Sequence, residues 1–574
     1  MPRDNRHRLN VIAMDEDGGG QHRLLNLSDP DALDPVLSGA KGAWLARGLE
    51  AGLPILPGWV VTAPVSRPHL ELGAEALIKR GSGGARLEVS QRALDPSLAN
   101  RLVEAGRALG DPLVVRSSSV LEGGAEWSGA FTSYLDIHPD ELPRAVTGCW
   151  ASVFGVSTLE RFEMESLAPE SSPMAVIIQP ALDPDYGGVA HIEGEEVVIT
   201  AVKGSPAPMV QGWAPGNTAR VPLEGEPTGH GAVDLMGTTL LNSVAGCLRK
   251  AQRTVGATSC EWATTGDTVH VLQLMRPPHV EPEGLRFDVT GLEDPVAILV
   301  GGLVRRFPGP LGEALVLPWA LGSPYAFLDP VEPADEDPRQ ALRSVREHVG
   351  TLTAQVWSLP KKRALSQAHR TLTELRGPNP STALAQLGSL HPPDPDLANL
   401  VRRHLASVFV GLVKIGAVTW PETAWHLDIE TIGAILEGRV TVEKQRRVGF
   451  ERWEPYGAAV TMANGVSTQG IAAAPGVAGG RFRVVPDNGV TDSFRPRDII
   501  VARHPTPNLA PLLWDASGLI TTGGGPGAHL FESARALAIP AVCAADLGDV
   551  IRDRRSELYV AVDGLTGTVY TSEW

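Results

Sequence analysis

His529 stands where a glycine-rich loop passes into a helical pattern, in the segment TTGGGPGAHLFESARALAIPAV (521–542). The pattern predicts a strand that ends at Thr521 and a helix that begins at about His529. The first N–H groups of a helix have no internal partners and the helix dipole is positive there, so this position suits a bound phosphate. A neutral imidazole is also a competent nucleophile near neutral pH. On the residues alone, His529 is either a phosphate carrier or a polar residue at a helix start.

Two cations in the first part of the chain are suited to binding phosphate oxygens. Lys41 lies in the glycine-punctuated segment SGAKGAWLARGLEAGLPILPGWVVTA (38–63), and Arg116 follows a hydrophobic strand pattern in PLVVRSSSVLEGG (112–124). A lysine neutralises phosphate oxygens as a point charge, whereas the planar fork of an arginine binds them with paired hydrogen bonds. Each residue also has a structural interpretation, as a surface lysine and as an ion pair at a strand end.

The composition is that of a globular protein with several domains. The chain has 574 residues, of which 43% are hydrophobic and 20% are charged, a length that suggests about two to four domains. The net charge of −16 argues against a nucleic acid or an anionic membrane as partner. The four cysteines lack CxxC spacing, and no hydrophobic run approaches the ~18 residues of a membrane span. We therefore expect a cytoplasmic protein without a nucleic-acid or membrane partner.

The segment 521–542 resembles the phosphohistidine domain of the PEP-utilising enzymes, which include pyruvate phosphate dikinase, PEP synthase and rifampin phosphotransferase. Three flanking segments, 474–485, 495–513 and 560–569, resemble the opening, middle and end of that domain. The residues that fall on the family's pattern are Gly523, Gly524, His529, Ala534, Arg535, Ile539, Pro540, Ala541 and Val542. By this resemblance His529 is the residue that carries phosphate.

Residues 30–280 resemble the ATP-grasp domain of the same family. The resemblance implies that ATP is the source of the phosphate and that Mg²⁺ accompanies it. Lys41 and Arg116 fall on phosphate-binding positions, and Gln179, in the strand pattern MAVIIQPAL, falls near the adenine edge. We therefore expect these residues to bind ATP.

The segment CEWATTGDTVHVLQLMRPP (260–278) resembles the end of the ATP-grasp domain. Glu261 and Gln273 fall on the positions for Mg²⁺ and the phosphate end, and oxygen ligands suit this metal. Arg276 is the matching ATP-binding arginine, but two residues separate it from Gln273 where the family has one. In a strand this shift turns a side chain to the other face, and a β-bulge would restore it.

Three departures from the family's pattern lie beside these residues. Gly123 replaces the aspartate that follows Glu122, which leaves the role of Glu122 open. Ala528 replaces the serine before the histidine, and Gly527 replaces a threonine that is a regulatory site in plant pyruvate phosphate dikinases. The resemblance implies that this regulatory switch is absent, whereas the catalytic histidine is kept.

We predict an α/β multidomain protein with an ATP-grasp nucleotide domain, a mostly helical middle domain and a C-terminal swivelling α/β phosphohistidine domain. Apolar residues at three- and four-residue spacing predict the helices of the middle domain. The predicted ranges are 1–24 for a flexible arm, 25–280 for the ATP-grasp domain, 281–440 for the acceptor-binding helical domain, 441–470 for a linker and 471–574 for the phosphohistidine domain. This order resembles rifampin phosphotransferase, because the chain ends before the barrel that binds PEP and pyruvate in the other members.

The acceptor side has the least specific sequence signals. The basic segment VEKQRRVGFERW (442–453) contains Lys444, Arg446 and Arg447, which either stabilise the transferring phosphate or form a solvated basic face. Three residues of the middle domain that either line an acceptor pocket or belong to a core or interface are Trp420, Trp425 and His426.

The implied reaction moves the β-phosphate of ATP to His529, with release of AMP and inorganic phosphate, and then to a small acceptor. The acceptor is a hydroxyl or a nitrogen, for example in an antibiotic or a specialised metabolite. Because His529 has to visit two sites, we expect its domain to swivel about the linker 441–470. Two alternatives stay open: a phosphohistidine carrier that serves a partner protein, and a degenerate ATP-binding relative without catalysis.

Overall fold

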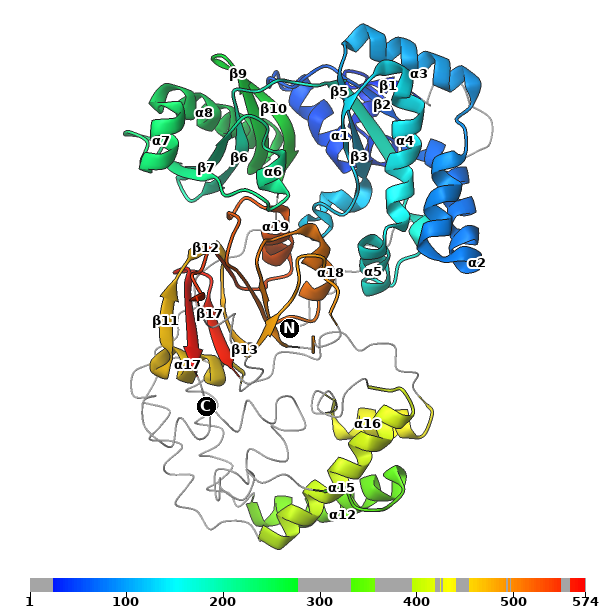
Figure 1. Ribbon diagram of the computed structural model, residues 1–574, viewed down its shortest axis with the longest axis vertical. Coiled ribbons are helices and arrows are strands. Elements are labelled where there is room, and N and C mark those ends of the chain that lie inside the picture. The colour runs from blue at the N-terminus through cyan, green and yellow to red at the C-terminus, as the bar shows by residue number, and fades with distance from the viewer. Residues whose placement is uncertain are drawn as a thin grey trace. The chain divides into compact units, whose positions relative to one another are not determined.

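The computed structural model of the chain divides into two compact units, which Figure 1 colours in chain order. The N-terminal unit comprises Met1–Pro206 and Thr218–Arg276, and the C-terminal unit comprises Ala207–Asn217 and Pro277–Trp574. The structure describes residues 24–276, 332–356, 395–418, 424, 427–439, 454–491, 494–495, 497–548 and 558–572. The segment 207–217 therefore groups with the later part of the chain, although it lies inside the range 25–280 expected for the nucleotide domain.

The first sheet of the N-terminal unit is antiparallel and has the strand order β1-β2-β5-β3-β4. Its strands are β1 (Leu24–Asn26), β2 (Trp59–Val61), β3 (Leu113–Ser119), β4 (Tyr134–Ile137) and β5 (Met174–Pro180). The helices of this part are α1 (Pro35–Glu50), α2 (Arg67–Gln91), α3 (Pro96–Leu109), α4 (Leu142–Ala151) and α5 (Val156–Met164). Strand β5 is buried from Met174 to Gln179, which explains its unbroken run of mostly hydrophobic residues.

Helix α1 carries Lys41 and approaches strand β3 closely. Gly39 has a φ angle of 69°, and a Cβ atom there would lie 2.0 Å from the carbonyl oxygen of Ser118. The Ser118 hydroxyl in turn accepts a hydrogen bond from the N–H of Gly42 at 3.0 Å. Glycine is therefore required at position 39 by the left-handed backbone and by the contact. This contact holds Lys41 beside the strand that carries Arg116.

The second sheet of the N-terminal unit has the strand order β10-β9-β6-β7-β8. Its strands are β6 (Tyr186–Glu193), β7 (Glu196–Lys203), β8 (Asn217–Val221), β9 (Ser259–Thr265) and β10 (Thr268–Met275), with helices α7 (His230–Met236) and α8 (Thr238–Val255). One hydrophobic core contains Leu45 of α1, Ile177 of β5, Trp262 of β9 and Leu248 of α8. Because α1, β5, β9 and α8 all contribute to this core, the two sheets of the unit are packed together through it.

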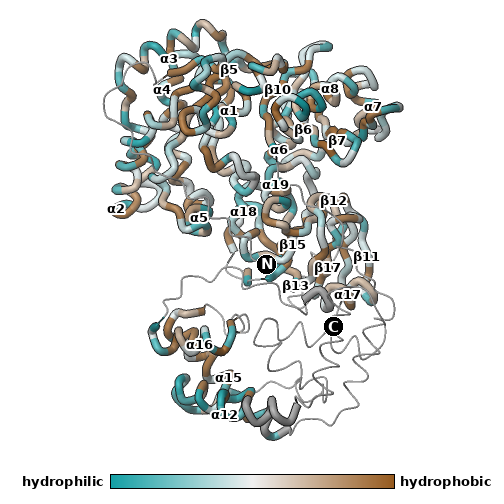
Figure 2. Tube along the Cα trace, turned by 180° about the vertical axis from the view of Figure 1, so that it is seen from behind, coloured by the Kyte–Doolittle hydropathy of each residue, from teal (hydrophilic) through white to brown (hydrophobic). Residues whose placement is uncertain are grey.

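Three predicted helices are present in the described part of the middle region. They are α12 (Pro338–Val356), α15 (Pro395–Lys414) and α16 (Ile429–Leu436). Val345, Leu405 and Ile432, one from each helix, are buried in a common hydrophobic cluster. The tube in Figure 2 changes between brown and teal along α15, as expected for an amphipathic helix.

The last part of the C-terminal unit is an α/β module around an eight-stranded sheet, with the order β11-β18-β17-β13-β14-β15-β16-β12. Its strands are β11 (Val466–Gln469), β12 (Ile471–Ala474), β13 (Val477–Val484), β14 (Ile499–Ala502), β15 (Gly518–Thr521), β16 (Ala541–Cys543), β17 (Tyr559–Asp563) and β18 (Thr568–Ser572). Its helices are α17 (Glu454–Asn464), α18 (Ala510–Leu513) and α19 (His529–Ala536). Strands β13 to β16 pair in parallel, and the remaining pairs are antiparallel.

The range 441–470, expected to be a linker, contains regular structure in its described part. Helix α17 packs on strands β13 and β17, and β11 pairs with β18 at the edge of the sheet. Val460 and Thr461 of α17 are fully buried, so one face of this helix belongs to the packed interior although the stretch as a whole has a polar sequence. The module therefore begins before residue 471. Among the described residues, no helix is long and apolar enough to cross a membrane.

Candidate phosphohistidine and nucleotide site

His529 is the first residue of helix α19, after the loop that leaves the parallel strand β15. The prediction of a strand end at Thr521 and a helix start at His529 is confirmed. Strand β15 lies between its parallel neighbours β14 and β16, and ligand sites in such sheets form beyond the carboxyl ends of the strands. The N-cap residue Ala528 gives the helix no side-chain hydrogen bond. The first N–H groups of the helix are therefore not taken by an N-cap side chain, which suits a phosphate.

The glycine loop before His529 depends on the absence of side chains. Gly524 has a φ angle of 78°, and a Cβ atom there would lie 2.4 Å from Cδ of Pro505. The N–H of Gly523 donates to the carbonyl oxygen of Arg503 at 2.8 Å, and the Thr521 hydroxyl donates to the Gly523 carbonyl at 2.8 Å. These contacts fix the path of the loop between the strand and the helix that starts with the histidine.

Glu532 is a neighbour of His529 that the sequence analysis missed. Its Oε2 lies 3.1 Å from His529 Nδ1, one helical turn along the same face. The side chains are 9% and 16% exposed, so the contact is largely shielded from water. The available signal was the spacing of three residues on a predicted helix, which places a carboxylate beside the imidazole.

His504 is a second imidazole beside the glycine loop. Its Nδ1 lies 2.8 Å from Oδ2 of Asp487, whose Oδ1 accepts the His504 backbone N–H at 3.0 Å. A Cβ atom on Gly523 would lie 3.4 Å from Cδ2 of His504. On another side the ring of Trp213, from the segment 207–217, lies 5.5 Å from the His504 ring between centroids. The pair Asp487–His504 therefore supports the loop, and no sequence motif predicted it.

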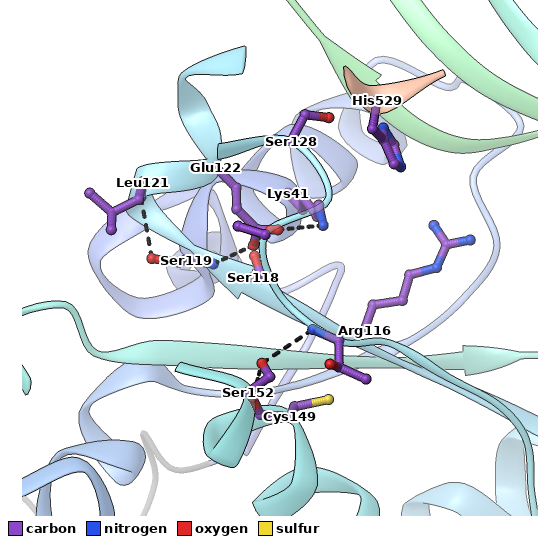
Figure 3. A network of polar contacts seen from close by, with 12 residues as sticks. Lys41, Arg116, Ser118, Ser119, Leu121, Glu122, Ser128, Cys149, Ser152 and His529 are labelled. Atoms are coloured by element: carbon purple, nitrogen blue, oxygen red, sulfur yellow. Dashed lines mark hydrogen bonds and ion pairs between the residues drawn. The ribbon is translucent and has the colours of Figure 1, made fainter. Parts of the chain in front are cut away.

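Lys41 and Glu122 form a largely buried ion pair in the N-terminal unit. The Lys41 Nζ lies 2.6 Å from Glu122 Oε1, and Figure 3 shows the two side chains pointing toward each other. The Glu122 side chain is 2% exposed and that of Lys41 is 17% exposed. Glu122 also accepts a hydrogen bond from the Ser119 N–H at 2.8 Å. Glu122 is thus fixed at both oxygens and holds the ammonium group of Lys41 in place, so its role is at least that of orienting the lysine.

Arg116 connects the two sheets of the N-terminal unit. Its Nη1 donates to the carbonyl oxygen of Leu272 on β10 at 2.7 Å. Burial lowers the pKa of the Arg116 guanidinium, and the negative charge of Glu261 opposes part of this shift. The predicted phosphate-binding arginine and the predicted metal-binding glutamate are therefore electrostatically coupled in the folded chain.

A β-bulge in β10 sets the position of Gln273. Val271 pairs with Trp262, and Gln273 pairs with the next residue, Glu261, so that Leu272 is the extra residue of the bulge. Glu261 and Gln273 are each 7% exposed and lie directly opposite each other. The two residues predicted to bind the metal are therefore brought together. The bulge lies before Gln273 and not between Gln273 and Arg276.

The remaining predicted ATP-binding residues differ in their surroundings. Gln179 is 4% exposed, and its Nε2 donates to the carbonyl oxygen of Leu56 at 2.9 Å. Arg276 follows the end of β10 and is exposed, with Nη1 3.8 Å from where a Cβ atom on Gly256 would lie. The assignment of Arg276 to ATP stays a prediction. The predicted acceptor-side residues that lie outside the described residues are Lys444, Arg446, Arg447, Trp420, Trp425 and His426.

Two family models match the chain over the two regions that carry these sites. The model described as "Pyruvate phosphate dikinase, AMP/ATP-binding domain" matches residues 36–230. The model described as "PEP-utilising enzyme, mobile domain" matches residues 494–567, which include His529. The first matched range contains Lys41 and Arg116, and the second contains the glycine loop.

Curated proteins similar to this chain carry related names. A phosphoenolpyruvate synthase of Aeropyrum pernix is 23% identical over 96% of this chain and 58% of its own length. One of Pyrococcus furiosus is 28% identical over 26% of this chain and 18% of its own length. The "Prodigiosin synthesizing transferase PigC" of Serratia marcescens is 32% identical over 29% of this chain and 19% of its own length.

The chain thus spans less than two thirds of the length of these relatives, at most 58% in the case of the Aeropyrum protein. The two matched domains occur in the order found by the sequence analysis, with mixed helix and sheet content in several domains. The N-terminal match identifies an ATP-binding domain, and the C-terminal match identifies the mobile domain in which His529 lies. Together with the similarity to phosphoenolpyruvate synthases, these two domain matches support the family of PEP-utilising enzymes for this chain.

Proposed function

We propose that the chain is a dikinase-type phosphotransferase in which His529 carries phosphate from ATP to a small acceptor. The observation that carries the proposal is the geometry of His529, at the start of α19 after a glycine loop and with Nδ1 held 3.1 Å from Glu532. In the reaction, Nε2 of His529 bonds to the β-phosphorus of ATP and the bond from that phosphorus to the α-phosphate oxygen breaks. AMP leaves with that oxygen, water attacks the γ-phosphorus and releases it as inorganic phosphate, and the phosphohistidine then passes the β-derived phosphate to the acceptor.

The N-terminal unit is proposed to be an ATP-grasp domain, and its residues have complementary roles. Lys41, oriented by Glu122, and Arg116, held by the bulge carbonyl of Leu272, neutralise phosphate oxygens. The carboxylate of Glu261 and the amide oxygen of Gln273 fit a magnesium ion, which takes one or two protein oxygens together with substrate phosphates. When bound, Mg²⁺ spreads the negative charge that develops on the phosphates during transfer.

The C-terminal module is proposed to swivel between ATP and the acceptor, and the middle helices are proposed to bind the acceptor. The acceptor is a hydroxyl or a nitrogen of a small molecule. One relative is named for the synthesis of prodigiosin and others for phosphoenolpyruvate, so membership of the family does not fix the acceptor. An antibiotic or a specialised metabolite is the proposed class of acceptor.

The test is labelling with ATP that carries radioactive phosphate at either the β or the γ position, in the presence of Mg²⁺. We expect acid-labile, base-stable label from the β position on the wild type and none on His529→Ala. The control is His138→Ala, because His138 lies on the surface of the other unit with a side chain 55% exposed and should keep full labelling. Label from the γ position would contradict the proposal, and no label from either would favour the degenerate alternative.

A chase of the labelled protein separates a small-molecule transferase from a carrier. The labelled wild type is freed of ATP and mixed with a filtrate of small metabolites or with the retained cell proteins. Loss of label to the filtrate supports the proposed transferase. Loss only to the protein fraction would instead assign the chain as a phosphohistidine carrier for a partner protein.

A further inference from the structure

The first observation is the close contact between Glu532 and the histidine. Glu532 lies three residues after His529 on helix α19, so both side chains leave the same face. The distance from Glu532 Oε2 to His529 Nδ1 is 3.1 Å, which is within hydrogen-bonding range. Glu532 is 7% exposed as a whole residue, so its carboxylate acts on the imidazole with little screening by water. The Glu532 carboxylate therefore interacts specifically with Nδ1 of the His529 ring.

The contact with Glu532 selects one tautomer of the His529 imidazole. A carboxylate accepts hydrogen bonds and donates none, so the atom that faces it has to be N–H. The neutral ring then carries its proton on Nδ1 and its lone pair on Nε2. Free neutral histidine favours the opposite tautomer, which carries its proton on Nε2. The contact with Glu532 therefore determines which nitrogen of His529 can act as nucleophile.

We propose that Glu532 is a positioning residue that directs phosphorylation to Nε2 of His529, an inference that rests on the proposed function. When Nε2 bonds to the β-phosphorus, the bond from that phosphorus to the leaving oxygen of AMP breaks, and AMP keeps the electron pair. The proton on Nδ1 stays in its hydrogen bond to Glu532. The ring then carries a positive charge, which the nearby carboxylate offsets during the attack and in the phosphohistidine.

The same residue also has a purely structural interpretation. A carboxylate in the first turn of a helix interacts favourably with the positive end of the helix dipole. That effect needs only a negative charge within the first turn, whereas the control of the tautomer depends on contact with Nδ1. The variant Glu532→Asp separates the two, because it keeps the charge in the first turn and withdraws the carboxylate by one methylene group.

The experiment is ¹⁵N NMR of the full-length protein labelled at histidine, without ATP, with His529→Ala used to assign the signals. We expect His529 of the wild type to be protonated at Nδ1 and not at Nε2. Glu532→Gln keeps an acceptor oxygen without the charge and should preserve this tautomer. Glu532→Leu and Glu532→Asp should shift the population toward protonation at Nε2. A wild-type His529 protonated at Nε2, or a Glu532→Asp variant identical to the wild type, overturns the inference.

Phosphorylation kinetics supply the second readout. We expect the rate of β-phosphate labelling to fall about tenfold in Glu532→Gln and about a hundredfold in Glu532→Leu, because general orientation and charge stabilisation have effects of this order. NMR of the labelled wild type should place the phosphate on Nε2. The control is Glu75→Gln, which removes a carboxylate that is 66% exposed on helix α2 and should leave the rate unchanged.

The two proposals fail in different ways. If the wild type is never labelled, the proposed function fails, and the tautomer of His529 still tests the contact with Glu532. If labelling proceeds at the wild-type rate in Glu532→Leu, the proposed function stands and the role of Glu532 is refuted. Folding of each variant is checked by the protection of α19 amides from hydrogen exchange.

Discussion

His69 shows how one buried side chain makes stability depend on pH. The residue is 6% exposed, and its ring centroid lies 4.7 Å from that of Trp150. Burial, together with the positive charge of Arg92, lowers the pKa of His69 to about 4. An imidazole in the unfolded chain has a pKa of about 6.5. The folded state therefore favours the neutral ring, whereas the unfolded state takes up a proton between these two values.

The first prediction follows from the difference between the pKa of His69 in the folded state and in the unfolded state. Stability from His69 is complete above about pH 6.5 and is lost as pH falls toward 4, because only the unfolded state binds a proton there. The loss amounts to at most about 3 kcal/mol. His69→Phe keeps a ring against Trp150 and removes the titration. Urea unfolding at pH 7 and pH 4.5 should therefore show a smaller acid-induced loss of stability in the variant than in the wild type. An equal loss in both proteins would disprove this origin of the pH dependence.

At the scale of elements, close backbone approaches position the functional side chains. Gly39 lets α1 touch β3 and so sets Lys41, and Gly524 lets the glycine loop pass Pro505 before His529. The bulge at Leu272 similarly turns Gln273 to face the same side as Glu261. In each case a short irregular segment, and not a regular helix or strand, decides where the candidate site residue lies.

Gly524→Ala tests the loop directly. The added Cβ atom meets Pro505 at 2.4 Å and the backbone has a φ angle of 78°, so both strain and clash oppose the substitution. We expect a loss of about 2 kcal/mol in the free energy of unfolding, together with weaker labelling of His529. Gly246→Ala is the control, since no atom lies within 4 Å of its added Cβ, and it should be neutral or stabilising. Equal stability of the two variants would argue against a constrained loop.

At the scale of the molecule, separate hydrophobic cores serve the nucleotide side and the histidine side. One core contains Ile177 and Trp262 of the N-terminal unit, and another contains Ile520 and Val562 of the C-terminal module. Each core has its own layers of helix and sheet, as expected for independently packed domains. This division is compatible with the proposed movement of the histidine module between two sites.

Calorimetry with and without Mg·ATP tests this division. We expect more than one unfolding transition, because separate cores lose their structure separately. Mg·ATP should raise the midpoint of the transition that belongs to the N-terminal unit, by the equivalent of about 2.7 kcal/mol at a hundredfold excess over Kd. Lys41→Met removes the ammonium group held by Glu122 and should reduce this shift. A shift of all transitions together, or of none, would contradict binding to one unit.

The sequence by itself determined the local elements and the order of the motifs. The strand that ends at Thr521, the helix that begins at His529 and the buried strand β5 follow from hydrophobic patterns and glycine positions, which are local properties of the chain. The resemblance alone suggested that Glu261 and Gln273 serve one site, and their pairing across β9 and β10, set by the bulge at Leu272, is a finding of the structure.

Only the tertiary structure decided the partners of these residues. The pairs Lys41–Glu122 and Arg116–Leu272 join residues 81 and 156 positions apart, and the pair Asp487–His504 joins two turns of irregular chain. Such contacts depend on how helices and strands pack, and no periodicity along the chain encodes them. The tertiary structure also groups α17 and the segment 207–217 with the C-terminal unit, in which α17 packs on β13 and β17 and Gly212 closely approaches Pro505.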